Sequence, residues 1–349
     1  MSALISVVMP VYNRAPLVGE AIESILGQTY EHLELIIVDD DSTDQSVVVI
    51  QQYRDPRIRL IRLPKNRGPS VARNIGNEAA RGTYIAVMDS DDIALPQRLE
   101  KQLAFMEAHP EVGLCGCSVH SIDEVGQRKK GAWQASSDPT LCRANLVFGI
   151  PFHHATWLVR RAIYEQLTYR TEWEPVADFD FMVEAARLTT FAGLRDTMML
   201  IRNHPERISR RRRKEQTNKT LFVSQRILER IGLHWNPMQL STWHHRLACL
   251  EARHPDTPPL KPDELEALAE LVSQLLQANQ RSGYMDQRAL QTLLAGRWWS
   301  VCRSAAVHGV AIFSLYRSSP ARWHGLARLV RDARMLSLCL GLGRNMWLD

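Results

Sequence analysis

Short runs of β-branched and aliphatic residues alternate with helical patterns over the first two hundred residues of the chain. Between these runs, apolar residues recur every three or four positions, which is typical of helices that cover a sheet. Strands that alternate with helices in this way form a mostly parallel sheet with helices on both faces. The pattern therefore predicts an α/β fold. The predicted strands are residues 5–11, 35–38, 58–63 and 84–88.

Beyond the fourth predicted strand the pattern is mixed. Residues 96–108 read as a helix, an apolar segment follows near residues 112–119, and residues 126–139 read as a loop region. From about residue 215 onward the pattern is helical throughout, with a proline-rich break at residues 254–259. The helix after this break carries an apolar face made of Leu265, Leu268, Leu271 and Leu275.

The length of the chain indicates more than one unit. A single core usually stops growing near 250 to 300 residues, and this chain has 349. The change in pattern places the boundary near residue 214. We expect an α/β domain over residues 1–214 and a helical region over residues 215–349.

Charge divides at nearly the same place. Residues 1–200 contain 20 Lys and Arg against 26 Asp and Glu, a net charge of −6, and the remaining residues contain 23 against 12, a net charge of +11. The overall value of +5 hides this asymmetry. An apolar fraction of 45% excludes a disordered chain. The sequence contains no run of about 18 apolar residues, so it predicts no membrane-spanning helix.

The N-terminus and the cysteines indicate a cytoplasmic protein. Residues 1–6 enter an apolar strand without a basic leader or a cleavage site, which argues against secretion. The six cysteines are scattered, and the only close pair, Cys115 and Cys117, does not match a zinc ribbon or a redox motif. We therefore expect buried, reduced thiols.

Two groups of carboxylates follow predicted strands directly. One comprises residues 39–41, and the other comprises Asp89, Asp91 and Asp92. In an open α/β sheet, ligands bind at the carboxyl ends of the strands. Crowded carboxylates repel one another unless a cation or hydrogen-bond donors offset the charge. Either group alone fits a solvated turn or a helix cap, but two groups in one layout favour a site for Mg²⁺ or Mn²⁺ with a diphosphate ligand.

Several motifs in a fixed order resemble the family 2 glycosyltransferases. Residues 10–14 (Pro-Val-Tyr-Asn-Arg) are similar to the family's first strand and loop. Residues 38–44 (Val-Asp-Asp-Asp-Ser-Thr-Asp) resemble its second motif, with Asp41 where glycine is usual. Residues 66–74 resemble the Asn-x-Gly-x-x-x-Ala-Arg-Asn segment, and residues 88–92 contain the Asp-x-Asp element. The resemblance implies a GT-A fold, which is mostly parallel and Rossmann-like, followed here by the α-helical C-terminal region.

The resemblance also implies roles for individual residues. Asp91 and His204 would serve the metal, either Mg²⁺ or Mn²⁺. Residues 1–120 would form the donor side of the domain, and residues 121–214 the acceptor side. The residues implied for binding the nucleotide sugar are Pro10, Val11, Tyr12, Asn13, Asp39, Asp40, Arg67, Gly68, Arg73 and Asp89.

Later motifs supply the acceptor side. Residues 151–161 resemble the segment that precedes the catalytic base, and residues 202–209 resemble the Arg-x-His-x-x-x-x-Ser stretch that contains His204. Residues 177–181 (Ala-Asp-Phe-Asp-Phe) resemble Glu-Asp-Tyr-Asp-Leu, in which the aspartate after the glutamate is the base. Asp178 is that residue here, although Ala177 replaces the glutamate. Without the resemblance, Asp178 would read as a helix N-cap.

These motifs predict an inverting, metal-dependent glycosyltransferase that uses a nucleotide-diphosphate sugar, with uridine as the expected base. In a single displacement a metal offsets the charge of the leaving diphosphate, and a carboxylate on the opposite face takes the acceptor proton. The expected acceptor is a glycan or a lipid-linked saccharide of a cell-surface polysaccharide such as lipopolysaccharide or capsule. The alternative is an inactive nucleotide-sugar-binding scaffold, favoured by Asp41 and Ala177. A dinucleotide-dependent oxidoreductase is disfavoured because no G-x-G-x-x-G follows the first strand.

The basic C-terminal half has two interpretations. Residues 210–214 (Arg-Arg-Arg-Arg-Lys) read as a solvated surface run or as a contact for phosphate on a lipid or a lipid-linked acceptor. From residue 297 onward, eight arginines and four tryptophans fit either an interfacial membrane segment or an appendage packed on the catalytic domain. No nucleic-acid-binding signature accompanies the charge. The expected location is the cytoplasm, with or without peripheral contact with an anionic inner membrane.

Overall fold

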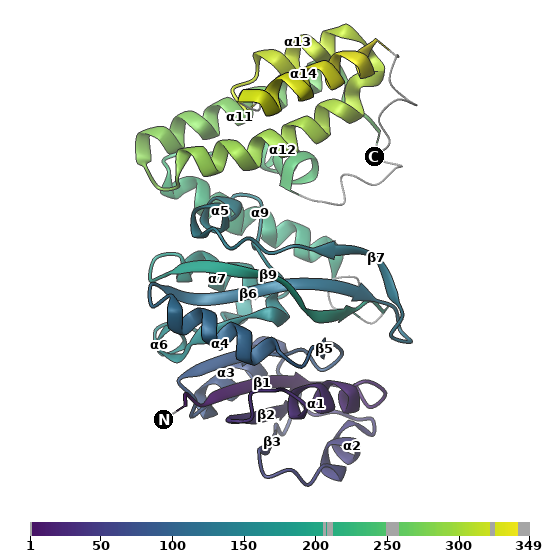
Figure 1. Ribbon diagram of the computed structural model, residues 1–349, viewed down its shortest axis with the longest axis vertical. Coiled ribbons are helices and arrows are strands. Elements are labelled where there is room, and N and C mark those ends of the chain that lie inside the picture. Colours follow the sequence, from purple (N-terminus) through teal and green to yellow (C-terminus); the bar gives the residue numbers. More distant parts are fainter. Residues whose placement is uncertain (1, 205–206, 208–211, 249–257, 322–324, 341–349) are drawn as a thin grey trace. The chain divides into compact units, whose positions relative to one another are not determined.

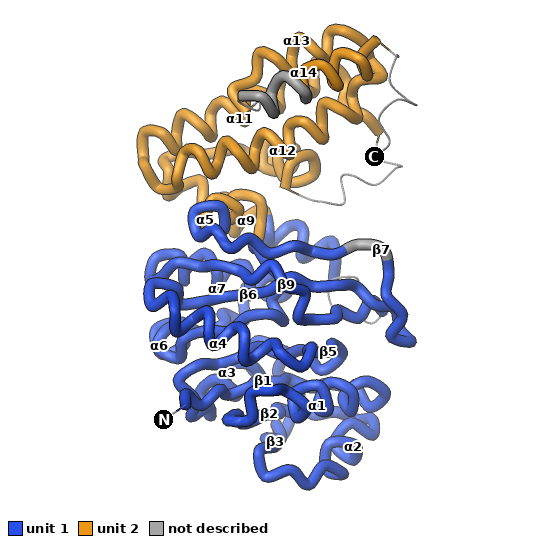
Figure 2. Tube along the Cα trace, viewed as in Figure 1, with its two compact units in different colours: residues 1–142, 150–220 blue, residues 143–149, 221–349 orange. Residues whose placement is uncertain are grey.

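The computed structural model describes residues 2–204, 207, 212–248, 258–321 and 325–340, the side chains of 130–131 and 325–330 excepted (Figure 1). The chain forms two compact units (Figure 2). The first comprises residues 1–142 and 150–220, and the second comprises residues 143–149 and 221–349. The short segment 143–149 thus belongs to the helical unit, which the sequence did not indicate. The division of residues 1–214 into donor and acceptor sides stays a prediction.

The first unit is built on a nine-stranded sheet with the order β3-β2-β1-β4-β8-β6-β9-β5, and β7 pairs with β6. Four pairings are parallel: β2 with β3, β1 with β2, β1 with β4, and β6 with β9. The predicted α/β architecture is confirmed, in a sheet whose described strands also make four antiparallel pairings. The strands are β1 (Ile5–Val11), β2 (Leu33–Asp39), β3 (Ile58–Arg62), β4 (Tyr84–Val87), β5 (Ile93–Ala94), β6 (Val112–Ile122), β7 (Arg128–Trp133), β8 (Leu158–Arg160) and β9 (Thr190–Arg202).

One sequence prediction about this sheet is wrong. Residues 126–139 are not a loop throughout, because β7 lies within them. Among the described strands, β7 pairs with β6 alone, and it begins with the basic residues Arg128 and Lys129. An edge strand of this kind is exposed and carries charges that hinder pairing with other chains. β7 therefore lacks the regular alternation of apolar and polar residues by which a strand is identified in a sequence.

Helices flank this sheet in the first unit (Figure 1). α3 packs against β1 and β2, and its close approach depends on Gly76. A Cβ atom at Gly76 would lie 2.4 Å from a methyl group of Val8, which leaves room for hydrogen only. The helices are α1 (Val18–Leu26), α2 (Ser46–Gln52), α3 (Pro69–Ala79), α4 (Arg98–Ala108), the start of α5 (Pro139–Asn145), α6 (Arg161–Tyr164), α7 (Ala177–Ala185) and the start of α9 (Arg213–Arg230).

The register of the central strands brings the predicted motifs to one edge of the sheet. Val11 at the end of β1 lies opposite Asp39 at the end of β2. β4, on the other side of β1, ends at Val87, directly before the second carboxylate group. Because these strands are parallel, their carboxyl ends meet where an α/β sheet binds ligands.

The second unit is helical, as predicted from the sequence. The four leucines on the predicted face of α11 are buried. Asp286 caps α12, where its carboxylate accepts a hydrogen bond from the backbone of Ala289 at 2.7 Å. The helices of this unit are the end of α9, α10 (Pro237–Trp243), a π-helical turn (His244–Ala248), α11 (Pro262–Ser282), α12 (Gln287–Ala305), α13 (Val310–Ser318) and α14 (Gly325–Cys339).

Aromatic residues hold segment 143–149 within this unit. The indole of Trp243 donates a hydrogen bond to the carbonyl of Val147 at 2.9 Å, and its ring stacks on Phe148 with centroids 5.4 Å apart. The central carbon of the Arg297 guanidinium lies 4.0 Å from the centre of the Phe148 ring. All three aromatic contacts are internal to the helical unit.

The arginines and tryptophans of the C-terminal region partly serve internal packing. Trp298 and Trp299 are buried, and Arg331 lies over the ring of Trp299 at 5.1 Å. These three residues therefore pack within the helical unit itself, and both interpretations of the C-terminal region stay predictions. Trp323, Trp347 and Arg344 lie outside the described residues. Among the described helices, none combines the length and the apolar character that crossing a bilayer requires.

The described cysteines are all buried, as expected, and none of them forms a disulfide with another described residue. Burial raises the pKa of Cys117 to about 11, so the thiol stays protonated at neutral pH. Cys249 lies outside the described residues. The described thiols therefore behave as small apolar side chains of the core.

Candidate active site

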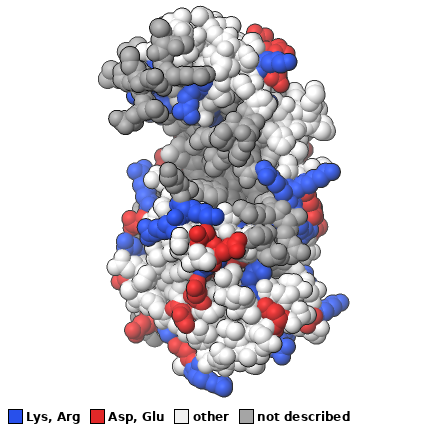
Figure 3. Space-filling model, turned by 90° about the vertical axis from the view of Figure 1, so that its right-hand side faces the viewer, with Lys and Arg blue, Asp and Glu red and all other residues white. Residues whose placement is uncertain are grey.

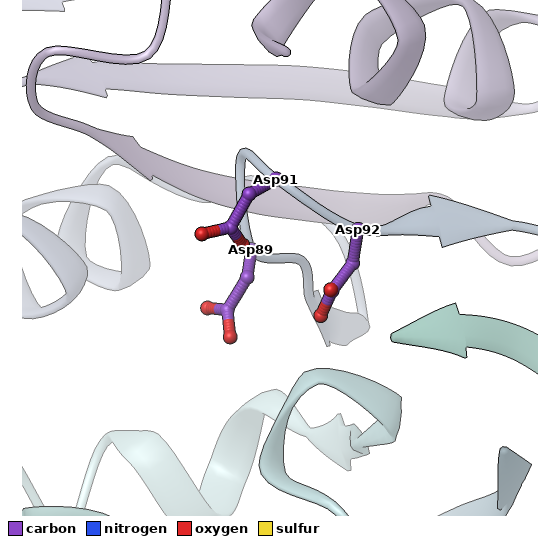
Figure 4. A group of neighbouring side chains, drawn as sticks. All are labelled: Asp89, Asp91 and Asp92. Atoms are coloured by element: carbon purple, nitrogen blue, oxygen red, sulfur yellow. The ribbon is translucent and has the colours of Figure 1, made fainter. Parts of the chain in front are cut away.

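Three carboxylates leave a single turn between β4 and β5 (Figure 4). Oxygen atoms of Asp89, Asp91 and Asp92 lie within 4.8 Å of one another. Acidic side chains also gather near the middle of the face of the first unit that Figure 3 shows, with Lys and Arg beside them. The turn is positioned by β4, whose backbone pairs with β1 on one side and β8 on the other.

Each carboxylate of this turn has a different protein partner. Asp89 accepts a hydrogen bond from Arg73 at 2.7 Å. Asp91 contacts His204 at 2.9 Å and the guanidinium of Arg14 at 3.3 Å, both through its Oδ2 atom. Asp92 accepts a hydrogen bond from the backbone of Arg202 at 2.8 Å.

The remaining oxygens of the turn fit a hard divalent ion. Among the residues that the structure describes, no donor contacts the second oxygen of Asp89, Asp91 or Asp92. Carboxylate oxygens are the ligands that Mg²⁺ and Mn²⁺ prefer, with water and phosphate oxygens filling the other positions. The donor set of the turn therefore fits the predicted metal.

The charges of the turn are unequally stabilised. Burial raises the pKa of Asp89, but the charge and hydrogen bond of Arg73, together with the nearby rings of His154 and His153, outweigh burial and lower the value to about 2. Burial and the neighbouring charges of Asp91 and Asp89 hold the pKa of Asp92 well above its usual range. A bound cation lowers the pKa of a carboxylate that it contacts, so it would stabilise the ionised form of this group, including Asp92.

A second part of the site is the loop before α3. Both oxygens of Asp40 accept backbone hydrogen bonds, from Arg67 at 2.7 Å and from Gly68 at 2.8 Å. Gly68 has a φ of 88°, in the region that favours glycine. Burial raises the pKa of Asp40, and the two backbone donors oppose this effect. Asp40 therefore fixes the loop to the end of β2, while the side chain of Arg67 remains exposed.

The loops after β1 and β2 support each other. The side-chain oxygen of Asn13 accepts a hydrogen bond from the backbone of Thr43 at 2.8 Å. Pro10 and Val11 are buried in β1, so only their backbones can face a ligand, whereas Tyr12 is 44% exposed. Asp39 is buried and accepts hydrogen bonds from the backbone of Ser42.

Asp41 occupies the position where the family pattern has glycine, and the backbone explains why glycine is usual there. The residue has a φ of 63°, in the left-handed region. Aspartate and asparagine tolerate this region better than other residues with a side chain. The exposed side chain of Asp41 meets no steric obstacle, so the replacement preserves the turn.

Asp178 lies in the first turn of α7. The N-cap of this helix is Val176, so Asp178 is not the cap that its sequence context also allowed. Its carboxylate accepts a hydrogen bond from the backbone of Phe179 at 2.8 Å. Burial raises the pKa of Asp178, while the nearby charge of Arg73 lowers it and that of Asp89 raises it further. The charge of Asp178 therefore interacts with those of Arg73 and Asp89.

The predicted acceptor-side segment places two histidines beside these groups. The Nε2 atom of His153 lies 3.3 Å from the guanidinium of Arg207. Burial lowers the pKa of His153 to about 4, so this ring is neutral at pH 7. His154 is buried and contacts the hydroxyl of Tyr169 at 2.8 Å, and burial holds its pKa well below the usual range.

The sequence did not single out Arg14, Arg202 or Glu174. Arg14 and Arg202 lie within motifs that were recognised, but their carboxylate partners are distant in the chain. Arg202 also donates a hydrogen bond to the carbonyl of Asp91 at 3.1 Å, so it fixes the turn from β9. The position of Arg14 and Arg202 within motifs could have identified them as site residues, whereas nothing in the sequence indicated Glu174.

The basic run at residues 210–214 is described only from Arg212 onward. Arg212 donates to Glu215 at 2.8 Å, and its guanidinium lies 3.7 Å from a carboxylate oxygen of Glu174. This arginine therefore has carboxylate partners in its own unit. Arg210 and Arg211 lie outside the described residues.

The sequence profile described as Glycosyl transferase family 2 matches residues 6–168. A glycosyltransferase of Haemophilus influenzae, itself uncharacterized, is 31% identical over 221 residues, which are 59% of this chain and 67% of that protein. TuaG of Bacillus subtilis, provisionally named as a glycosyltransferase of teichuronic acid biosynthesis, is 46% identical over 105 residues, 30% of this chain and 42% of TuaG. A second uncharacterized glycosyltransferase of H. influenzae is 42% identical over 135 residues, which are 36% of this chain. The match spans 54% of that protein, about half of its length.

Solved structures share the fold at low sequence identity. TarS of S. aureus, in a complex with UDP-GlcNAc, has a TM-score of 0.56 and 17% identity, over 92% of this chain and 93% of that one. A mannosyltransferase of Pyrobaculum calidifontis, in a complex with GDP-Man and Mn²⁺, has a TM-score of 0.50 and 19% identity, over 95% and 86% of the two chains. The two likenesses extend over both units of this chain.

Proposed function

This chain belongs to the family 2 glycosyltransferases, and from that premise we propose that it transfers a sugar from a nucleotide diphosphate to a growing cell-surface polysaccharide. The proposed acceptor is a glycan or a lipid-linked saccharide. The name of TuaG, which refers to the synthesis of a cell-wall polymer, supports the proposed pathway class. We place the reaction on the cytoplasmic side of the membrane, where nucleotide sugars are made.

The observation that carries the proposal is the common location of the aspartate turn, Arg73 and Asp178. The second oxygens of Asp89 and Asp91, which no donor among the described residues contacts, would hold Mg²⁺ or Mn²⁺, with His204 orienting Asp91 through its 2.9 Å contact. When bound, the ion offsets the negative charge that develops on the leaving diphosphate. The Mn²⁺ in the mannosyltransferase complex supports a metal in this fold.

Asp178 is the proposed general base. A base that accepts the proton of an acceptor hydroxyl works best when its pKa approaches the working pH. Burial raises the pKa of Asp178 in that direction. Attack by the deprotonated hydroxyl from the face opposite the diphosphate would invert the anomeric carbon in one displacement.

The loops after β1 and β2 and the loop held by Asp40 are the proposed nucleotide site. The exposed ring of Tyr12 and the exposed guanidinium of Arg67 are available for the base and the phosphates. Uridine is the proposed base, as in the ligand of TarS, and the GDP-Man ligand of the mannosyltransferase makes guanosine the first alternative.

A screen for nucleotide release tests the proposal. The protein is incubated with a panel of UDP and GDP sugars, with and without Mn²⁺, and free nucleotide is measured. We expect release from one donor that depends on the metal. Asp178→Asn should retain nucleotide binding by calorimetry and lose transfer. A panel without any metal-dependent release would instead favour the inactive scaffold.

A further inference from the structure

Glu174 connects two parts of the site that are far apart in the sequence. It lies in the short segment between residues 171–173 and the start of α7. Its Oε1 atom accepts a hydrogen bond from the backbone of Ser70 in the first turn of α3, at 2.7 Å. Its side chain is only 14% exposed. Glu174 thus crosses from the segment before the proposed base to the loop of the proposed donor site.

The carboxylate of Glu174 completes the hydrogen bonding of this loop. The first amides of a helix have no partner within the helix. Arg67 and Gly68 donate to Asp40, Pro69 has no N–H group, and Ser70 donates to Glu174. Two carboxylates, one from the end of β2 and one from the segment before α7, therefore hold the loop.

The fit of Glu174 against the loop is close. A Cβ atom added to Gly68 would lie 3.0 Å from the Oε2 atom of Glu174. Glu174 also contributes to the raised pKa of Asp40 through its negative charge, which shows that the two carboxylates are neighbours. A shift of either carboxylate would therefore move the same backbone.

The other end of this connection is α7. Glu174 is four positions before Asp178, and the backbone between them is fixed by a hydrogen bond from Val176 to Trp173 at 2.7 Å. The carbonyl of Glu174 accepts a hydrogen bond from Lys219, and Arg212 approaches its carboxylate. The segment that carries Glu174 and the start of α7 is therefore held as one piece.

We propose that Glu174 is a positioning residue that couples the donor loop to the base Asp178. The inference rests on the proposed function of this site. By holding the amide of Ser70, Glu174 sets the distance between the loop that binds the nucleotide and the helix that carries the base. The family pattern has a glutamate at the position of Ala177, and in this chain the carboxylate that the segment directs to the donor loop is Glu174, three positions earlier.

The test separates hydrogen-bond geometry from charge. Glu174→Gln keeps an oxygen at the same reach, so we expect kcat and the KM for the donor to stay within about 3-fold of wild type. Glu174→Asp keeps the charge but is one methylene too short for Ser70, and we expect a loss of about 10- to 100-fold in kcat/KM, as for a lost hydrogen bond to a charged group. Glu174→Ala should resemble Glu174→Asp.

The assay uses the full chain, Mn²⁺ and the donor identified by nucleotide release, and the affinity for UDP with Mn²⁺ is measured by calorimetry. Glu172→Ala is the matched control, because Glu172 is exposed and lies in the same segment. Melting temperatures identify a variant that fails to fold, in which case the Gln and Asp variants are compared directly. Activity of Glu174→Asp equal to wild type, or rescue by Asp and not by Gln, would overturn the inference. An inactive wild type would count against the proposed function itself.

Discussion

The pair formed by Arg73 and Asp89 offers a quantitative test of the site. We consider Arg73→Met, which removes the charge and keeps much of the volume. Arg73 contacts Asp89 at 2.7 Å, and the two side chains are 15% and 26% exposed. Met at this position would leave a largely buried carboxylate without its cation, which is costly because the desolvation of the charge is no longer offset.

The magnitude follows from the pKa of Asp89. Burial raises this pKa, but Arg73, with smaller contributions from His154 and His153, lowers it from 3.8 to about 2. The two nearby histidines are neutral at pH 7, so Arg73 is the partner that acts at that pH. One pKa unit corresponds to about 1.36 kcal/mol, so the ionised Asp89 contributes at most about 2 kcal/mol to folding at pH 7, where the two histidines carry no charge. Because the folded pKa is the lower one, this contribution is lost as the pH falls from about 4 through about 2.

The assay is a double-mutant cycle that combines Arg73→Met with Asp89→Asn. The stability of each variant is measured by thermal unfolding at pH 7 without divalent ions. We expect Arg73→Met to lower Tm by about 4 to 8 °C and the coupling energy to be about 2 kcal/mol. The exposed pair Lys101 and Asp196, at 3.0 Å, is the control, with an expected coupling below about 1 kcal/mol. A coupling below about 0.5 kcal/mol between Arg73 and Asp89 would refute the reasoning.

Three further predictions concern the backbone and the base. Asp41→Gly should raise the free energy of unfolding in urea by up to about 1 kcal/mol, because glycine adopts the φ of 63° without cost; a decrease would contradict this account. Gly76→Ala should lower the free energy of unfolding by about 1 to 3 kcal/mol, because its Cβ would lie 2.4 Å from Val8, and an unchanged Tm would show that the helix can move away. The rate of transfer should rise with pH through a pKa above that of an ordinary aspartate, since only the ionised Asp178 accepts a proton; a pH profile without this limb would exclude Asp178 as the base.

The order of the early elements could be predicted from the sequence because each has a local cause. β1, β2 and β4 are buried throughout, so they appear as mostly apolar runs. α3 begins where Gly68 and Pro69 end an extended segment, and Pro69 occupies the first turn, where its missing N–H group costs nothing. β7 was missed because an exposed edge strand has no such period.

The site could be predicted only as far as its motifs reach. Residues of the Asp-x-Asp turn were identified because they follow a strand directly. Glu174 and its partner Ser70 are 104 positions apart, and no local pattern relates them. The burial that raises the pKa of Asp178 likewise depends on how distant segments pack, so the electrostatics of the base could not be deduced from residues 177–181 alone.

The assignment of residues 143–149 to the helical unit has a consequence for modularity. The chain enters this unit twice, once through the short segment and once through residues 221–349. A chain cut after residue 220 would expose Val147 and Phe148, which are 2% and 6% exposed beside Trp243. Recombination that exchanged only the C-terminal helices between relatives would meet the same obstacle. The helical unit is inherited as two pieces of sequence, and any exchange has to carry both.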